Sequence, residues 1–490
     1  MGMMARKKTV VLYPGFGVGH LTPMLELAKV FLRHAGDSLD VAVALAEPPI
    51  MSAGFHAAVA RAQAANPSVS FHILPTPAAG EPKVEEEPLV TIIRFLRATN
   101  APLRDFLRSH SPPAAALVLD MFCADALDVA AEHALPAYFL FPSGASGLAV
   151  FLALPAARAA IGGAGGFGSL GADAVLTFHG APPLRVSELS QGLAEDGESC
   201  RAMLRVAARM PVGARGILIN SFEALEPRAM EALRDGRCLP DSPTPPVYCV
   251  GPLVSPGGAA DDDDRHECLR WMDAQPDRSV VFLCFGSLGA FPKHQLAEIA
   301  AGLESSGQRF LWVVRSPHPP GAAVATAGEE SFDEAELLPA GFKERTKDRG
   351  LVVNSWAPQV DVLRHRAAGA FVTHCGWNST LEGVAAGVPL LCWPLYAEQK
   401  MNKVRIVEDM RLGVGMEMDG EGFVKAEEVE KKVRWVMEGG DGEVRELRKR
   451  VAKAKELAAE AVEEGGPSDL AFVEFLKDLF EASHQGLVHV

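Results

Sequence analysis

The feature that most constrains the fold of this 490-residue chain is a strand–helix–strand rhythm, which occurs on both sides of a proline-rich break. Short apolar runs alternate with helical patterns, which predicts parallel sheets covered by helices on both faces. The fold class is therefore α/β, with two doubly wound, Rossmann-like domains. The expected strands are 7–13, 39–46, 114–119, 137–141 and 216–220 in the first half, and 279–285, 309–315, 350–354, 369–373 and 389–394 in the second.

Helical patterns fill the intervals between these strands and close the chain. Pro23 is typical of a first helical turn, so the first helix is expected to begin near Thr22. The main expected helices are 22–34, 124–133, 224–234, 293–306, 376–386, 426–437, 442–463 and 467–482.

The break between Gly236 and Gly258 contains six prolines, and the acidic run Asp261–Asp264 follows it. This composition is typical of an interdomain linker, and 490 residues are too many for one hydrophobic core. We expect an N-terminal domain at 1–240, a linker at 241–265 and a C-terminal domain at 266–465.

The net charge of −15 argues against a nucleic-acid or anionic-membrane partner. The sequence contains no run of about 20 apolar residues, so no membrane span is predicted. The apolar run after the basic first residues is too short for a signal peptide. The eight cysteines lack metal-binding spacing and indicate reduced thiols. We therefore expect a cytoplasmic protein, with a monomer as the default state.

The most informative run, 356–399, surrounds the junction between the strand that precedes His374 and the next helix. Residues 376–379 open this helix, and Gly387 suits its C-terminal end. A first helical turn presents backbone N–H groups and a partial positive charge, which suit a diphosphate. Ser379 adds a hydroxyl donor, so this junction is a candidate diphosphate site.

Other side chains in this run suit the rest of a nucleotide sugar. Trp356 offers a flat face on which a base can stack, and the carboxylate of Glu382 can accept both hydroxyls of a ribose. Glu398 and Gln399 follow the next strand and can hold sugar hydroxyls. Taken singly, a tryptophan is more often a core residue and a helix-start serine more often a cap. Their combination is what indicates a nucleotide-sugar site.

The first turn of the chain ends in His20, which stands where a dinucleotide-binding fingerprint has its third glycine. This argues against an NAD(P) site. A neutral imidazole at this sheet edge can act as a general base for an acceptor hydroxyl. Asp120 ends another strand and can hydrogen-bond one ring nitrogen, stabilising the imidazolium. Helix capping is the simpler role for both residues.

No metal site is indicated. Asp261–Asp264 contains an Asp-x-Asp spacing, but it lies in the expected linker and is interpreted as a solvated run. We expect the helix N-terminus at 376–380 and His374 to stabilise a departing diphosphate instead, with neutral donors rather than a basic patch.

The run 356–399 closely resembles the 44-residue signature box of plant UDP-dependent secondary-product glycosyltransferases, the plant branch of the UDP-glycosyltransferase family. The resemblance implies the GT-B fold, with the donor bound to the C-terminal half, the acceptor bound to the N-terminal half, and the site in the cleft between them. It also implies that the last helix, in 466–490, returns to the N-terminal domain. The implied donor-binding residues are Trp356, Ala357, Gln359, His374, Trp377, Asn378, Ser379, Glu382, Tyr396, Glu398 and Gln399.

Residues outside the box extend the resemblance. The family's glycine-rich turn ending in histidine matches His20, and its pattern of Asp followed by an aromatic residue and Cys matches 120–123. The resemblance implies that His20 is the base and Asp120 its partner. Gly19 in this turn, Ser143 near the donor sugar and Ser287 in a second phosphate-contacting turn are further implied donor contacts.

The resemblance implies an inverting, metal-independent transferase that uses UDP-glucose as a co-substrate and needs no other cofactor. Gln399 favours glucose, because family members that prefer galactose tend to have histidine at this place. The product is then a β-glucoside of a small lipophilic acceptor.

The identity of the acceptor is left open. Variable loops at about 75–95, 142–155 and 180–205 mix apolar residues with few charges, which is consistent with a flat phenolic such as a flavonoid. The Pro-rich loop 316–336 resembles that of members active on flavonoids and chalcones. A terpenoid, hormone or xenobiotic acceptor, C-glycosylation and another UDP-sugar donor are alternatives. The rival classes are a nucleotide-dependent oxidoreductase and a non-catalytic binder with the same fold.

Overall fold

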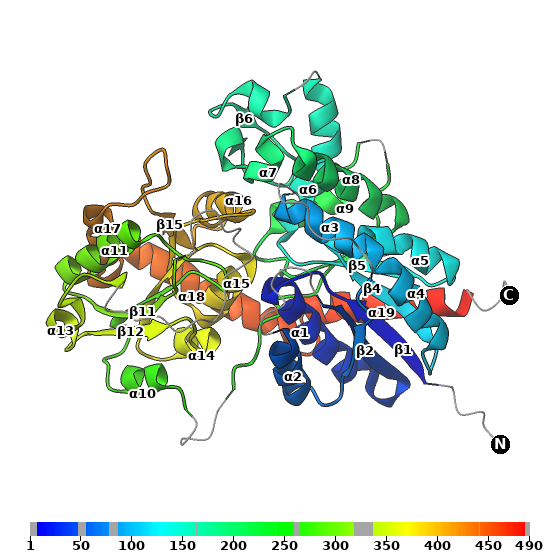
Figure 1. The fold of residues 1–490 in the computed structure, drawn as a ribbon, viewed down its shortest axis with the longest axis horizontal. Coiled ribbons are helices and arrows are strands. Elements are labelled where there is room, and N and C mark those ends of the chain that lie inside the picture. Colours follow the sequence, from blue (N-terminus) through cyan, green and yellow to red (C-terminus); the bar gives the residue numbers. More distant parts are fainter. Residues whose placement is uncertain are drawn as a thin grey trace. The chain divides into compact units, whose positions relative to one another are not determined.

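The computed structural model describes residues 7–47, 55–77, 87–162, 165–240, 242–258, 265–317, 337–440 and 442–485. The chain forms two compact units. Unit 1 consists of Met1–Leu253 and Glu460–Val490, and unit 2 consists of Val254–Ala459. In each unit, helices surround a central sheet (Figure 1). The predicted α/β class with two parallel sheets is confirmed.

Unit 1 contains a seven-stranded sheet in the order β3-β2-β1-β4-β5-β8-β9, in which all neighbouring strands are parallel. Its central strands are apolar and buried on both faces, as parallel sheets require. A short antiparallel hairpin of β6 (Val175–Leu176) and β7 (Leu184–Arg185) lies outside this sheet. The strands of the sheet are β1 (Lys8–Tyr13), β2 (Leu39–Ala46), β3 (Ser70–Leu74), β4 (Ala114–Asp120), β5 (Ala137–Phe141), β8 (Gly216–Ile219) and β9 (Val247–Cys249).

The helices of unit 1 connect these strands and cover the sheet. They are α1 (Val18–Ala35), α2 (Phe55–Ala65), α3 (Pro88–Ala98), α4 (Asn100–Ser109), α5 (Leu127–Glu132), α6 (Ala145–Ile161), α7 (Gln191–Ala194), α8 (Glu198–Gly213), α9 (Pro227–Arg234) and α19 (Pro467–Gln485).

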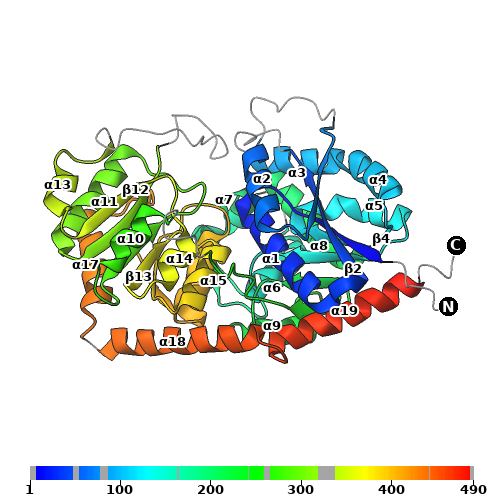
Figure 2. The same ribbon diagram turned by 90° about the horizontal axis from the view of Figure 1, so that it is seen from below.

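The helix α19 belongs to the core of unit 1, although more than 200 residues separate it from the last strand of the sheet. Its side chains Phe472, Phe475, Leu476 and Leu479 are buried among residues of β1, β2 and α1. The ring of Phe31 in α1 meets the ring of Phe472 edge-on, with centroids 5.1 Å apart. The two helices therefore pack on the same face of the sheet (Figure 2).

Unit 2 contains a six-stranded parallel sheet in the order β12-β11-β10-β13-β14-β15. Its strands are β10 (Val280–Cys284), β11 (Arg309–Val314), β12 (Gly350–Asn354), β13 (Ala368–Thr373), β14 (Leu390–Cys392) and β15 (Gly413–Gly415). Its helices are α10 (Glu267–Asp273), α11 (Lys293–Ser306), α13 (Phe342–Thr346), α14 (Gln359–Arg364), α15 (Trp377–Ala386), α16 (Gln399–Val404), α17 (Ala426–Glu438) and α18 (Gly442–Val462), the last of which extends past the boundary of the unit at Ala459.

Three predicted helix boundaries are wrong. The first helix begins at Val18 rather than near Thr22, because Pro23 lies inside α1 rather than in its first turn. Residues 121–126 form a 3₁₀ segment before the short α5, and Cys123 within this segment has a non-helical backbone. The helix expected from 224 begins at Pro227, where the fixed φ of proline suits the first position.

Several predicted segments lie outside the described residues: the acidic run 261–264, residues 78–86 of one expected acceptor loop, and residues 318–336 of the Pro-rich loop. All eight cysteines are buried and free. None of the helices in the described part of the chain is long and apolar enough to cross a membrane.

Candidate active site

His20 and Asp120 form a hydrogen-bonded pair in unit 1. His20 lies in the first turn of α1, directly after β1, and Asp120 is the last residue of the neighbouring strand β4. Their Nδ1 and Oδ2 atoms are 2.7 Å apart. The Asp120 side chain is 1% exposed and that of His20 is 22% exposed. The parallel order of β1 and β4 thus brings an almost buried carboxylate to a partly exposed imidazole.

Asp120 also caps the 3₁₀ segment that follows it. Its Oδ1 accepts a hydrogen bond from the backbone N–H of Phe122 at 2.9 Å, while its Oδ2 faces His20. The capping role and the role as partner of His20 are therefore compatible. Gly15 leaves the room for this carboxylate, because a Cβ there would lie 2.6 Å from Oδ1 of Asp120.

Apart from Asp120, apolar side chains lie near His20. The half-buried ring of Phe122 lies 5.1 Å from the imidazole, centroid to centroid. Phe16, in the turn before α1, packs against Phe95 of α3, and Val18 is exposed. Gly19 is also exposed, one residue before His20. This surface suits the ring of an aromatic molecule better than a charged one.

Ser143 lies between β5 and α6, and its buried Oγ has no hydrogen-bond partner among the residues that the structure describes. The start of α6 beside it is held by Glu226, which accepts hydrogen bonds from the backbone N–H groups of Ala145 at 2.8 Å and Ser146 at 3.0 Å. Ser221 also donates its hydroxyl to Glu226. Glu226 therefore fixes the segment that carries Ser143, a function that the sequence did not reveal.

His374 follows β13 in unit 2 and is neutral near pH 7. Burial lowers its pKa to about 4. A Cβ on Gly286 would lie 2.6 Å from Nε2 of His374, and one on Gly376 would lie 2.4 Å from it. Both glycines therefore allow the backbone to approach the ring. His374 can donate a hydrogen bond to a phosphate but contributes no charge.

The helix α15 begins at Trp377 with Gly376 as its N-cap and without a side-chain cap. Its start faces the carboxyl edge of the sheet, where a partial positive charge suits an anion. The Trp377 ring is buried, so it packs in the core, whereas Asn378 is half-buried. The helix ends as predicted at Gly387, which has the left-handed conformation.

Ser379 and Glu382 of α15 form a hydrogen-bonded group with Gln359, the first residue of α14. The amide of Gln359 donates to Oγ of Ser379 at 2.8 Å and to Oε2 of Glu382 at 2.5 Å. Burial raises the pKa of Glu382 to about 7, against the effects of the Gln359 hydrogen bond and the Arg364 charge. Trp356 is 60% exposed, which contradicts a core role, and its neighbour Ala357 is buried.

The segment after β14 contains Tyr396, Glu398 and Gln399. Oε1 of the buried Gln399 accepts hydrogen bonds from the backbone N–H groups of Leu395 and Tyr396, at 2.8 and 2.9 Å. This oxygen therefore shapes the turn. Asn402, a buried residue missed by the sequence reasoning, donates to Glu398 at 3.1 Å and to the carbonyl of Cys375 at 2.9 Å.

Ser287 is exposed in the turn after β10. Arg315, after the adjacent strand β11, donates from Nε to the carbonyl of Gly286 at 3.0 Å. An arginine therefore lies at this edge, where the sequence analysis named only neutral donors. Its position as the last, charged residue of the predicted strand 309–315 is the signal that could have identified it.

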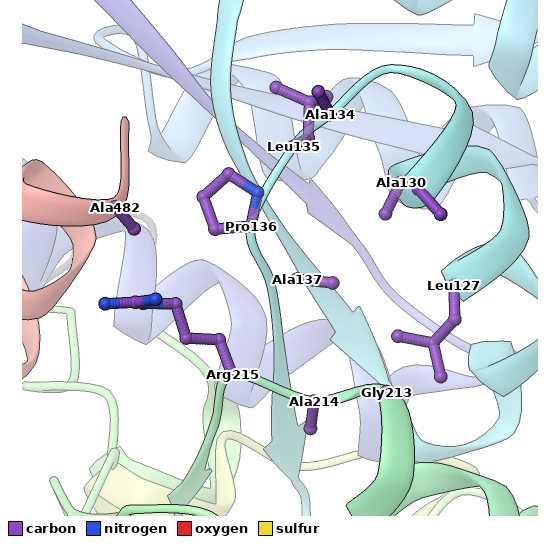
Figure 3. Close-up of a pocket in the computed structure, with 11 residues that line it drawn as sticks. Leu127, Ala130, Ala134, Leu135, Pro136, Ala137, Gly213, Ala214, Arg215 and Ala482 are labelled. Carbon is purple, nitrogen blue, oxygen red and sulfur yellow. The ribbon is translucent and has the colours of Figure 1, made fainter. Parts of the chain in front are cut away.

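A shallow cavity of about 500 Å³ lies elsewhere in unit 1, at the amino ends of β5 and β8 (Figure 3). Alanine, leucine and proline side chains line it, and Arg215 reaches it beside Ala482 of α19. His20 and Asp120 lie at the carboxyl edge of the same sheet, so this cavity is separate from them. Within the described residues, no group of three or more His, Cys, Asp or Glu side chains could hold a metal ion.

Comparisons with known proteins show which proteins this chain is similar to. The family model of UDP-glucoronosyl and UDP-glucosyl transferase matches residues 249–439. An anthocyanidin 5,3-O-glucosyltransferase from Rosa hybrid cultivar is 42% identical, over 94% of this chain and 96% of its own. A phloretin 2'-O-glucosyltransferase from Pyrus communis is 41% identical, and the match covers 96% of this chain and 99% of the relative.

The fold is shared with solved structures. The structure of Phytolacca americana UGT2 complexed with UDP-2fluoro-glucose and pterostilbene superposes with a TM-score of 0.83 at 34% identity. The match covers 96% of this chain and 99% of that one. The two parallel sheets are thus those of the GT-B fold.

Proposed function

Because this chain belongs to the plant UDP-glycosyltransferase family, we propose that it transfers glucose from UDP-glucose to a hydroxyl of a small phenolic acceptor, with inversion at the anomeric carbon. The observation that carries the chemistry is the 2.7 Å hydrogen bond between His20 and Asp120. It supplies a base that is oriented by a buried carboxylate, at a partly exposed position.

In this mechanism Asp120 accepts the Nδ1–H of His20, so that Nε2 takes the proton of the acceptor hydroxyl. The acceptor oxygen forms a bond to the anomeric carbon while the bond from that carbon to the phosphate oxygen breaks. Attack opposite the leaving UDP converts an α-linked donor into a β-glucoside. Asp120 stabilises the imidazolium that results.

The donor is proposed to bind at the carboxyl edge of the sheet in unit 2. The exposed Trp356 would stack on the base, and Glu382 with Gln359 would hold the ribose. The start of α15, Ser379, Ser287 and neutral His374 would hold the diphosphate, so the proposal includes no metal ion. The remaining proposed donor contacts are Gly19, Ser143, Ala357, Trp377, Asn378, Tyr396, Glu398 and Gln399.

A flavonoid-type acceptor is favoured for two reasons. The named relatives act on an anthocyanidin and on phloretin. The exposed or half-buried Phe16, Val18 and Phe122 around His20 are suited to an aromatic ring. Residues 1–240 are therefore proposed to bind the acceptor and residues 266–465 to bind the donor.

The test is mass-spectrometric detection of a hexose product with UDP-glucose and phloretin, an anthocyanidin, simple phenols or terpenoid alcohols. We expect a β-glucoside of a flavonoid-type acceptor, formed equally well in EDTA, and a loss of about 100-fold or more in kcat for His20→Ala. His34→Ala is the matched control, because it removes another histidine–aspartate pair from α1. A His20→Ala variant with the kcat of the wild type would refute the proposed base.

A further inference from the structure

An arginine that this mechanism does not use lies within the proposed donor edge of unit 2. The sheet order β12-β11-β10-β13 places Arg315, after β11, between Trp356, after β12, and Ser287, after β10. The backbone N–H of Ser355 donates to the carbonyl of Val314 at 2.7 Å, which fixes the chain next to Arg315. Arg315 therefore stands between the proposed base-binding and phosphate-binding residues.

Arg315 holds one side of the turn that carries Ser287. Its Nε donates to the carbonyl of Gly286 at 3.0 Å. Gly286 has a φ of +76°, and a Cβ there would lie 2.6 Å from Nε2 of His374. The Gly286 backbone thus lies close to the imidazole and accepts a hydrogen bond from the guanidinium.

The positive charge of Arg315 acts across this edge. Burial raises the pKa of Tyr396 to about 12 and that of Cys284 to about 11. The charge of the Arg315 guanidinium favours the ionised form of both groups and so opposes this rise in their pKa values. His374 is neutral near pH 7, and Ser287 and Ser379 carry no charge. A guanidinium stays ionised at every relevant pH and binds phosphate oxygens strongly.

We propose that Arg315 is a positioning residue for the diphosphate of the donor. It holds the turn of Ser287 in place, and its charge favours a nucleoside diphosphate over an uncharged nucleoside. The inference rests on the proposed function, since it requires UDP to bind at this edge. It adds one cation to a set of donors that otherwise consists of neutral groups and the start of α15.

The test is isothermal titration calorimetry of the full chain, which measures its affinity for UDP and for uridine. The wild type is compared with Arg315→Met and Arg315→Lys. We expect Arg315→Met to weaken UDP binding by about tenfold or more and to change uridine binding by less than about twofold. Arg315→Lys keeps the charge but loses the planar guanidinium, so its UDP affinity should be intermediate. The salt dependence of UDP binding should be weaker in Arg315→Met than in the wild type.

Arg309→Met is the matched control, because Arg309 is exposed at the opposite end of β11 and should leave UDP affinity unchanged. Equal losses for UDP and uridine in Arg315→Met would overturn the inference, since they would indicate a general distortion of the site. Unchanged UDP binding would overturn it as well. A wild-type protein that binds no UDP would instead refute the proposed function, which separates the two failures.

Discussion

Glu382 is a carboxyl group that burial makes costly to ionise. Its pKa is raised to about 7 from an ordinary value of 4.5. A carboxyl with a higher pKa in the folded than in the unfolded chain gives stability that is complete below the unfolded pKa. That stability is lost as the pH rises through the folded pKa. The ligand-free protein should therefore lose stability between about pH 4.5 and pH 7 on account of this residue.

We expect Glu382→Gln to raise the Tm of the ligand-free protein at pH 8 and to raise it much less at pH 5. The same variant should bind UDP about tenfold more weakly at pH 8, because an amide oxygen is a weaker acceptor for ribose hydroxyls than a carboxylate. Thermal unfolding and calorimetric titration at both pH values check this. A Tm at pH 8 equal to or below that of the wild type would contradict the assigned cost of ionisation.

Candidate functional residues could be identified from the sequence, but the burial and the hydrogen-bond partners of their side chains could not. The signature box identified His374 and Glu382, yet their pKa shifts depend on burial, which only the folded chain creates. Asn402 and Glu226 escaped notice because each acts on backbone groups far away in sequence. Arg315 follows a strand, where a charged residue usually marks the end of the buried run.

The strands were the most predictable elements. The ranges 39–46, 137–141 and 350–354 agree with β2, β5 and β12 to the residue, because buried parallel strands are continuous apolar runs. Helix starts were less predictable. The start of α1 is set by the turn at Gly17 rather than by Pro23, and the cap at Asp120 produces a 3₁₀ segment that no periodicity reveals.

The helix α19 makes a testable contribution to the stability of unit 1. Phe475 is fully buried, and its ring meets those of Phe31, Tyr138 and Tyr248 with centroids 4.9–5.7 Å apart. We expect Phe475→Ala to lower the free energy of unfolding of unit 1 by about 3–5 kcal/mol. Urea denaturation measures this. Leu470→Ala, on the exposed side of the same helix, should change it by less than about 0.5 kcal/mol.

A loss below about 1 kcal/mol for Phe475→Ala would show that α19 covers unit 1 without completing its core. The ion pair of Arg215 with Asp478, at 2.8 Å, and the hydrogen bond from Tyr138 to Asp478, at 2.6 Å, would then be the main attachments of the helix.

At the scale of the whole molecule, the proposed base belongs to unit 1 and most of the proposed donor contacts belong to unit 2, with Gly19 and Ser143 as the exceptions in unit 1. His20 and Asp120 lie in unit 1, whereas Trp356, Ser379 and Glu382 lie in unit 2. We expect the UDP affinity of His20→Ala and Asp120→Asn to stay within about twofold of that of the wild type, while their kcat falls by about 100-fold or more. Ser379→Ala should instead weaken UDP binding. Calorimetric titration with UDP and initial-rate measurements check this. A loss of UDP affinity as large as the loss of kcat in His20→Ala would contradict the assignment of the base and of UDP binding to different residues.

Unit 1 is made from two separate stretches of chain, and the second leaves the ribosome only after all of unit 2. When the first 253 residues have been synthesised, the faces of Phe31, Tyr138 and Tyr248 that will meet Phe475 are still in water. Unit 2 is continuous, so its core can close as soon as it emerges. We therefore expect unit 2 to complete its folding before unit 1, although most of unit 1 is synthesised first. The incomplete core of unit 1 is then exposed to aggregation for longer than that of unit 2.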